Sequence, residues 1–284
     1  MQSTDGVQLA VHELGGDTTM RPLLLCHATG FHARVWDAVA AEFPDRRCVA
    51  LDFRGYGDST PPADGRFDWK GFADDVLAVI DELGVSEVQA VGHSKGGAAL
   101  LVAELARPGT FERLVCFEPI VFPAPTEGVP TPSTGPNPMA EAARRRRAHF
   151  DSIEAAVERF SSKATLGRLR PDVLEAYVRH GLRPDPDGGV VLKADPEHEA
   201  RTYEMGPELG AFERIRGVGS PVLVCAGDDG DLPGQLAPMV AEQLPRGSFH
   251  RFEGLGHFGP LEDPARFAAV VRAFLEDPDP DDHG

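Results

Sequence analysis

Short, continuous apolar runs recur along the first 117 residues and predict buried strands. The first strand is expected at residues 7–14, where apolar and polar side chains alternate as in a half-buried strand. Four fully apolar runs follow, and such runs are typical of strands covered on both faces of a parallel sheet. They occupy residues 22–26, 48–51, 88–91 and 114–117.

Helical patterns separate these runs. A glycine-containing loop at residues 27–36 leads into a predicted helix of about ten residues. Residues 69–83 place apolar side chains at helical spacing and end at Gly84, and residues 98–106 are rich in Ala and Leu. Strands that alternate with helices predict an α/β fold, in which a mostly parallel sheet carries helices on both faces.

The pattern changes after residue 121. Residues 122–138 are rich in proline and lack apolar periodicity, so we interpret them as a linker. Helical patterns at 139–160, 171–180 and 195–205, with one short hairpin arm near 190–193, predict a mainly helical insertion over 122–213. The α/β core is then expected to comprise residues 1–121 and 214–284.

The sheet is expected to resume after this insertion. Residues 221–225 and 248–252 are predicted strands, and residues 235–243 and 264–275 are predicted helices. The last residues, 276–284, are acidic and interrupted by proline, which predicts a disordered tail.

Composition narrows the class of partner. A net charge of −17 over 284 residues argues against nucleic acid as a partner, because phosphate binding needs a basic face, and against binding to an anionic membrane surface. No apolar run is long enough to span a bilayer, and the N-terminus lacks the basic and apolar regions of a signal peptide. Four widely spaced cysteines in apolar runs predict buried free thiols, so we expect a cytoplasmic protein. They are Cys26, Cys48, Cys116 and Cys225.

Ser94 is the candidate nucleophile. It lies in the sequence Gly92-His93-Ser94-Lys95-Gly96, between the predicted strand at 88–91 and the helix that follows. A G-x-S-x-G sequence between a strand and a helix is typical of a nucleophile elbow, where a sharp turn exposes one serine hydroxyl. The two glycines allow the strand and the helix to approach closely around the serine.

A serine hydroxyl needs a base, an acid that orients the base, and donors for the oxyanion. The expected base is His257, in a glycine-rich loop after the last predicted strand. The expected oxyanion donors are the backbone N–H groups of Lys95 and Thr29. All these residues follow predicted strands, at the sheet edge where parallel α/β proteins place their active sites.

Four sequences together resemble the α/β-hydrolase fold superfamily. They are the HG-x-like loop at 27–30, the D-x-R-G-x-G-x-S loop at 52–59, the GHS-x-GG elbow at 92–97 and the GHF sequence at 256–258. The resemblance spans residues 22 to about 270 and implies a helical cap where the insertion lies. Two residues depart from the family pattern: Ala28 replaces a glycine, and Lys95 replaces a residue that is more often Met or Gln.

Two positions compete for the catalytic acid. Most members of this superfamily carry it after the strand that corresponds to residues 222–225, where this chain has Asp228, Asp229 and Asp231 around Gly230. Lactone-hydrolysing and some dehalogenase-like members carry it one strand earlier, where this chain has Glu118. A carboxylate at the end of that strand would be partly buried, which is rare for an unpaired Glu, and we favour Glu118.

The predicted activity is hydrolysis of a small-molecule ester, lactone or thioester through an acyl-enzyme on Ser94. A carbon–carbon bond hydrolase, an acyltransferase or a peptidase uses the same triad, and a non-catalytic ligand-binding homologue shares the fold. No metal or organic cofactor is implied, and the oligomeric state is left open.

For the Lys95 side chain two interpretations stand: it points away from the substrate, or it places a positive charge at the pocket wall. The basic run at residues 144–147 is expected to be a solvated helix face.

Overall fold

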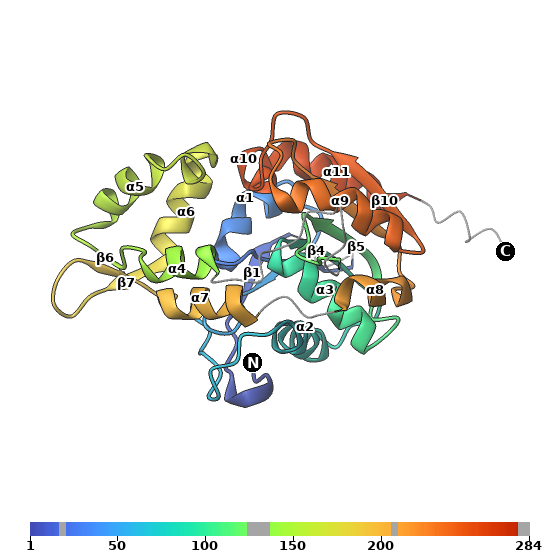
Figure 1. The fold of residues 1–284 in the computed structure, drawn as a ribbon, viewed down its shortest axis with the longest axis horizontal. Helices are drawn as coiled ribbons and strands as arrows, with labels where there is room; N and C mark the ends of the chain where they lie inside the picture. Colours follow the sequence, from blue (N-terminus) through green and yellow to red (C-terminus); the bar gives the residue numbers. More distant parts are fainter. Residues whose placement is uncertain (17–20, 124–136, 206–209, 278–284) are drawn as a thin grey trace.

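A seven-stranded sheet forms the centre of the protein in the computed structural model, which describes residues 1–16, 21–123, 137–205 and 210–277 (Figure 1). The strand order is β1-β3-β2-β4-β5-β9-β10. Only β1 pairs antiparallel, and the other neighbours are parallel. The strands are β1 (Val11–Gly15), β2 (Leu23–Cys26), β3 (Cys48–Leu51), β4 (Val88–His93), β5 (Phe111–Phe117), β9 (Val222–Ala226) and β10 (Gly247–Arg251).

Successive strand residues point to opposite faces of this sheet, and each face has its own core. In β2, Leu24 and Cys26 belong to one apolar cluster, whereas Leu23 and Leu25 belong to the other. The first cluster is covered by α2 (Trp69–Leu83), α3 (Lys95–Ala106), α8 (Ala211–Arg214) and α9 (Leu232–Gln243). The second is covered by α1 (Asp37–Ala40), α10 (Gly259–Glu262) and α11 (Pro264–Glu276). The predicted fold class is therefore confirmed.

Some predicted boundaries were wrong. The first strand begins at Val11 and not at residue 7, and the helix expected after residue 36 is a 3₁₀ turn, Ala33–Trp36, followed by the four-residue α1. The helix after the elbow begins at Lys95, three residues earlier than expected, because Ser94 turns directly into it. Two further 3₁₀ turns, Thr4–Gly6 and Ile215–Gly217, also belong to this part of the chain.

The helices between residues 137 and 205, in the described part of the inserted segment, lie together on one side of the sheet in Figure 1. They are α4 (Pro138–Arg144), α5 (Ile153–Ser161), α6 (Pro171–Gly181) and α7 (Pro196–Met205), with a 3₁₀ turn at Leu166–Arg168. A small antiparallel sheet joins them, in the order β6 (His149–Phe150), β8 (Val190–Leu192) and β7 (Leu182–Pro184). We call this segment, residues 137–205, the cap.

The prediction of a single helix over residues 139–160 was wrong. His149 and Phe150 pair with β8, which interrupts the helix, and the Ser152 side chain then caps α5 by accepting a hydrogen bond from the Ala155 amide at 3.1 Å. The predicted hairpin arm is accordingly one strand of a three-stranded sheet. Most of the predicted linker, residues 124–136, and the tail from residue 278 lie outside the described residues.

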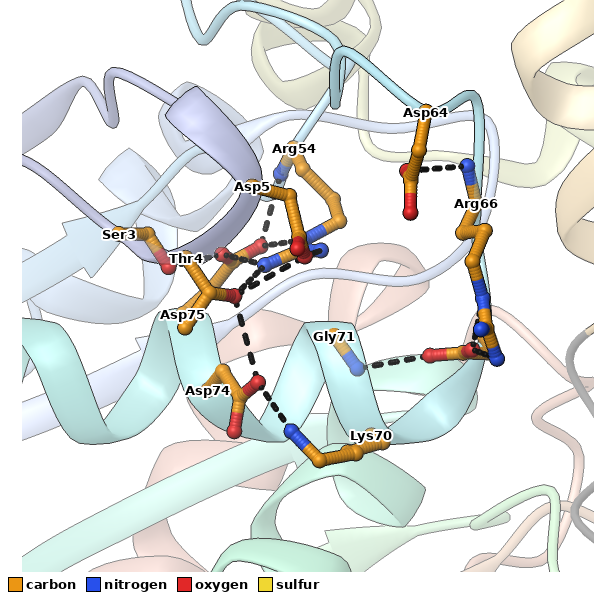
Figure 2. Close-up of polar contacts among 11 residues, drawn as sticks. Ser3, Thr4, Asp5, Arg54, Asp64, Arg66, Lys70, Gly71, Asp74 and Asp75 are labelled. Atoms are coloured by element: carbon orange, nitrogen blue, oxygen red, sulfur yellow. Dashed lines mark hydrogen bonds and ion pairs between the residues drawn. The ribbon is translucent and has the colours of Figure 1, made fainter.

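The loop after β3 is fixed by a buried ion pair. Arg54 and Asp75 of α2 are both almost fully buried, and their closest ion-pair distance is 2.8 Å. Figure 2 shows the Arg54 guanidinium between Asp75 and the N-terminal residues Thr4 and Asp5, which it also contacts. Ser3 donates to the same Asp75 carboxylate at 2.6 Å. The N-terminus is therefore tied to the loop that carries the D-x-R-G-x-G-x-S sequence.

Two expectations drawn from composition can be compared with the structure. The four cysteines are free and buried, as predicted. Among the described residues, the helices are too short or too polar to cross a lipid bilayer.

Candidate active site

Ser94 lies at a sharp turn between β4 and α3. Its backbone has φ 54° and ψ −113°, a conformation that non-glycine residues rarely adopt. A Cβ on Gly92 would lie 2.5 Å from the Gly97 nitrogen, and one on Gly96 would lie 2.2 Å from the Cys26 carbonyl oxygen. Only glycine permits both approaches, so the local structure has the form expected of a nucleophile elbow.

Glu118 and His257 are in direct contact, although 139 residues separate them in the chain. Glu118 immediately follows β5, is fully buried and has a positive φ of 45°. One carboxylate oxygen accepts a hydrogen bond from the Gly227 amide at 2.8 Å, and the other contacts Nδ1 of His257. Because a carboxylate only accepts, Nδ1 carries the proton and Nε2 of the neutral ring is left as the basic nitrogen.

The three alternative aspartates surround the histidine loop in different ways. Asp231 Oδ2 lies 3.2 Å from His257 Nδ1, and its other oxygen caps α9 by accepting from the Gly234 amide. Asp229 accepts a hydrogen bond from the His257 amide at 3.2 Å. Asp228 accepts from the Gly254 amide. Glu118 thus lies closer to the imidazole than Asp231 does, and the hydrogen bonds of Asp228 and Asp229 in the described chain go to the backbone of the histidine loop.

The protonation of this cluster depends on burial and on its neighbouring charges. Burial lowers the pKa of His257, but the hydrogen bond and negative charge of Glu118, with the charges of Asp231 and Asp229, outweigh it and raise that pKa above its usual value. Burial and the Glu118 charge raise the pKa of Asp231 to about 6. The carboxylates around His257 therefore favour its protonated form, against the effect of burial.

Ser94 and the histidine loop are linked through His93. Nε2 of His93 donates a hydrogen bond to the His257 carbonyl oxygen at 2.8 Å, and the two imidazole rings are 5.0 Å apart. The Ser94 amide donates to the carbonyl oxygen of Phe117, the residue before Glu118. Within the described residues, Ser94 Oγ makes no hydrogen bond to His257; such bonds often form only once substrate is bound.

The predicted oxyanion donors are both available. In the described chain, the amides of Thr29 and Lys95 donate to no backbone carbonyl. Thr29 lies in a turn closed by the Phe31 amide and the Ala28 carbonyl, and Gly30 supplies the positive φ of 80° that this turn needs. Behind the turn, the buried His27 ring bonds the Ala28 carbonyl oxygen at 2.7 Å and accepts from the Phe53 amide at 3.1 Å.

The Lys95 side chain points away from the predicted oxyanion position. It is fully buried, and its Nζ lies 3.7 Å from the ring centre of Tyr56 and 4.5 Å from those of Phe53 and Phe72. Nζ has no hydrogen-bond partner in the described part of the chain. Burial lowers the pKa of Lys95 well below its usual value. The hypothesis of a positive charge at the pocket wall was therefore wrong.

The prediction that the basic run at residues 144–147 forms a solvated helix face was only partly right. The helix ends at Arg144, and Arg146 in the following loop is largely buried. It contacts Glu199 of α7 and donates to the hydroxyl of Tyr177 of α6 at 2.8 Å. These cap residues lie against the predicted oxyanion loop, since Glu199 Oε1 is 3.0 Å from where a Cβ on Gly30 would be. The sequence contains no motif that marks this cluster.

Among the residues that the structure describes, two groups of side chains have their ligand atoms close enough to hold a metal ion. They are His12 with Asp52 and Asp58, and Glu118 with Asp231 and His257. In the first, the Asp52 carboxylate accepts hydrogen bonds from the amides of Ala33 and Asp58 at 2.7 and 2.9 Å. The second contains the proposed base and acid, His257 and Glu118, together with Asp231. Hydrogen bonds account for both groups, and we assign neither to a metal.

Comparison with known proteins places the chain in a family. The profile described as "Alpha/beta hydrolase family" matches residues 23–270, and the chain therefore belongs to this family and has the fold of a hydrolase. It is similar to the 2-hydroxymuconate semialdehyde hydrolases of Pseudomonas sp. (strain CF600) and of Pseudomonas putida. The first is 28% identical over 281 residues, which cover 96% of this chain and 92% of the relative. The second is 27% identical over 91% of this chain and 88% of the relative.

The fold likeness extends to solved structures. The crystal structure of E-2-(acetamidomethylene)succinate hydrolase superposes with a TM-score of 0.77 over 97% of this chain and 98% of its own. Its sequence is 20% identical to this one, so the likeness concerns the fold alone.

Proposed function

We propose that this hydrolase cleaves a small-molecule ester, lactone or thioester through an acyl-enzyme on Ser94. The contact between His257 and Glu118 beside the strained Ser94 turn carries the proposal. It supplies a serine with a base whose tautomer is fixed by a buried carboxylate, as nucleophilic acyl transfer requires.

In the proposed reaction, Ser94 Oγ attacks the substrate carbonyl while Nε2 of His257 takes its proton. The amides of Thr29 and Lys95 donate to the resulting oxyanion, and each such donor is typically worth about 3 kcal/mol. The carbon–oxygen or carbon–sulfur bond breaks, and His257 returns the proton to the leaving group. Water then attacks the acyl-enzyme with His257 as base, which releases the acid and restores Ser94.

A second candidate activity is hydrolysis of a carbon–carbon bond. It is favoured by the two relatives named for 2-hydroxymuconate semialdehyde. That compound contains no ester, so its hydrolysis must break a carbon–carbon bond next to a carbonyl group. The same serine, base and oxyanion donors serve this chemistry.

A substrate panel separates the two activities. Alkyl esters, lactones and thioesters of graded size are assayed beside 2-hydroxymuconate semialdehyde, each with the wild type and with Ser94→Ala. We expect turnover of at least one ester, lactone or thioester that Ser94→Ala abolishes. Turnover of the semialdehyde alone would replace the first proposal with the second.

A further inference from the structure

A small cavity lies on the cap side of the predicted oxyanion loop. Its wall from the core includes Gly30, Phe31 and His32, while Arg146 and Tyr177 provide polar groups from the cap. The rest of the lining is mostly apolar and comprises Phe160, Val178, Leu182, Leu192 and Ala194. Phe31 packs against both Tyr177 and Phe258, with ring centres 5.0 Å apart in each case, so it connects this cavity to the histidine loop.

Arg146 retains unused donors in this cavity. A guanidinium has five N–H groups, and within the described residues two atoms of Arg146 donate: Nη1 to Glu199 and Nη2 to the Tyr177 hydroxyl. Nη1 lies 3.4 Å from where a Cβ on Gly30 would be. The Arg146 guanidinium therefore lies against Gly30, the residue that follows Thr29, whose amide we propose as an oxyanion donor.

The ion pair between Arg146 and Glu199 is partly buried, and such a pair is weak evidence for a role in stability. Replacing such a pair by apolar residues of similar size is often neutral or stabilising, so its presence calls for another role. Glu199 is buried, and its Oε2 contacts Nη1 of Arg146. The remaining N–H groups of the guanidinium match the planar, two-oxygen geometry of a second carboxylate.

We propose that Arg146 binds a carboxylate on the acyl part of the substrate, two or three carbons from the carbonyl that Ser94 attacks. This inference rests on the proposed function and names its substrate class as half-esters of short dicarboxylic acids. Glu199 orients the guanidinium and, because it is itself negative, limits how tightly the substrate anion binds.

The test compares two esters of equal shape. Methyl hydrogen succinate carries a carboxylate where methyl 4-methylpentanoate carries an isopropyl group, and both release methanol. kcat/KM is measured for each with the wild type, Arg146→Met and Glu199→Gln. Arg145→Met is the matched control, because Arg145 is the neighbouring arginine but is exposed and pairs only with Glu141 among the described residues.

We expect Arg146→Met to lower kcat/KM for the half-ester by about 10- to 100-fold, the worth of a charged hydrogen bond. The neutral ester should change by less than about threefold, and Glu199→Gln should shift the preference toward the half-ester. The double variant Arg146→Met/Glu199→Gln leaves no unpaired carboxylate and should show the same loss of preference if Arg146→Met alone folds poorly. An unchanged ratio of the two esters in these variants would overturn the proposal.

A binding measurement separates this proposal from the proposed function. Calorimetry with methyl hydrogen succinate is carried out on Ser94→Ala and on Ser94→Ala/Arg146→Met. If Arg146→Met weakens binding of the half-ester to Ser94→Ala about tenfold or more, the carboxylate site is supported, even where the wild type turns over neither ester. Equal binding by both variants, or no binding by either, overturns it.

Discussion

At His257, two opposing influences set the protonation state of the proposed base. Burial favours the neutral ring, whereas the Glu118 carboxylate favours the imidazolium and raises the pKa. The base must be neutral to accept the Ser94 proton, so activity should rise with pH through that raised pKa. Glu118 therefore shifts the loss of activity at acidic pH to a higher pH. It also orients the ring and stabilises the imidazolium of the transition state.

Replacing Glu118 separates these two effects. Glu118→Gln keeps a hydrogen-bond acceptor but removes the charge, so the pKa of His257 should fall toward its usual value. The acidic limb of the kcat/KM profile should then move to lower pH, while the plateau falls by about 10²- to 10⁴-fold. The profile is measured by steady-state assays of wild type and variant.

Asp231→Asn is the control for this experiment, because Asp231 lies 3.2 Å from the same nitrogen. It should lower the plateau less than Glu118→Gln does. Near-full activity in Glu118→Gln, together with a large loss in one of the loop aspartate variants, would assign the acid to the loop at residues 228–231.

Lys95 carries a cost for stability that depends on pH. Its ammonium is fully buried without a hydrogen bond, and the depressed pKa means that the unfolded chain binds this proton more strongly than the folded one. Stability should therefore rise with pH up to the unfolded pKa near 10.5. Lys95→Met should raise the free energy of unfolding at pH 7 by about 1 kcal/mol or more, with a smaller gain near pH 10.

Denaturant titrations at several pH values measure this change, with the exposed Lys70→Met as control. A pH-independent loss of stability in Lys95→Met would instead mean that the three aromatic rings stabilise the ammonium. The ratio of activity toward neutral and anionic esters should stay unchanged in this variant, because the charge does not face the predicted oxyanion position.

At the scale of elements, the close contact between α3 and β2 determines the shape of the Ser94 turn. Ala normally stabilises a helix relative to Gly, but a Cβ on Gly96 would lie 2.2 Å from the Cys26 carbonyl oxygen. Gly96→Ala should therefore lower the free energy of unfolding by about 1–3 kcal/mol and reduce Ser94 reactivity.

The matched substitution is Gly219→Ala, since a Cβ at Gly219 meets nothing within 4 Å and its φ is not positive. Chemical denaturation measures both variants. Equal stability of Gly96→Ala and the wild type would show that the helix can move away from the sheet without cost.

The elements themselves differ in how well the sequence predicts them. Strands of the central sheet are predicted by their apolar runs, because burial on both faces demands apolar residues at every position. The cap helices are short and amphipathic, so the strand at His149–Phe150 leaves no clear local pattern and depends on pairing with β8. Capping by Ser152 is visible in the sequence but does not by itself reveal the break before it.

The residues of the candidate site likewise divide into those that the sequence predicts and those that it does not. Ser94, His257 and Glu118 follow strands and belong to short sequences with recognisable spacing, so they could be named from the sequence. Arg146 and Glu199 are 53 residues apart and meet only through the packing of cap helices. Lys95 likewise acquires its surroundings from aromatic side chains on two other segments, and its orientation could not be predicted.

At the scale of the whole molecule, the cap packs against the core through apolar side chains of one shared cluster and through polar contacts. The Tyr56 hydroxyl bonds Thr202 of α7 at 2.7 Å, and Lys193 pairs with Asp58 at 2.6 Å. The first contact is buried, whereas the second involves an exposed carboxylate and contributes little. The cap thus meets the core around the loops that carry the predicted oxyanion hole.

The formation of a covalent adduct on Ser94 tests the central claim most directly. Folded wild-type protein and Ser94→Ala are treated with a fluorophosphonate, and intact mass and peptide mapping are used to count and locate the adducts. We predict one adduct per wild-type chain, on Ser94, which forms more slowly when His257 is protonated at acidic pH and is absent from Ser94→Ala. No adduct on the folded wild type, or equal labelling of both proteins, would contradict the account.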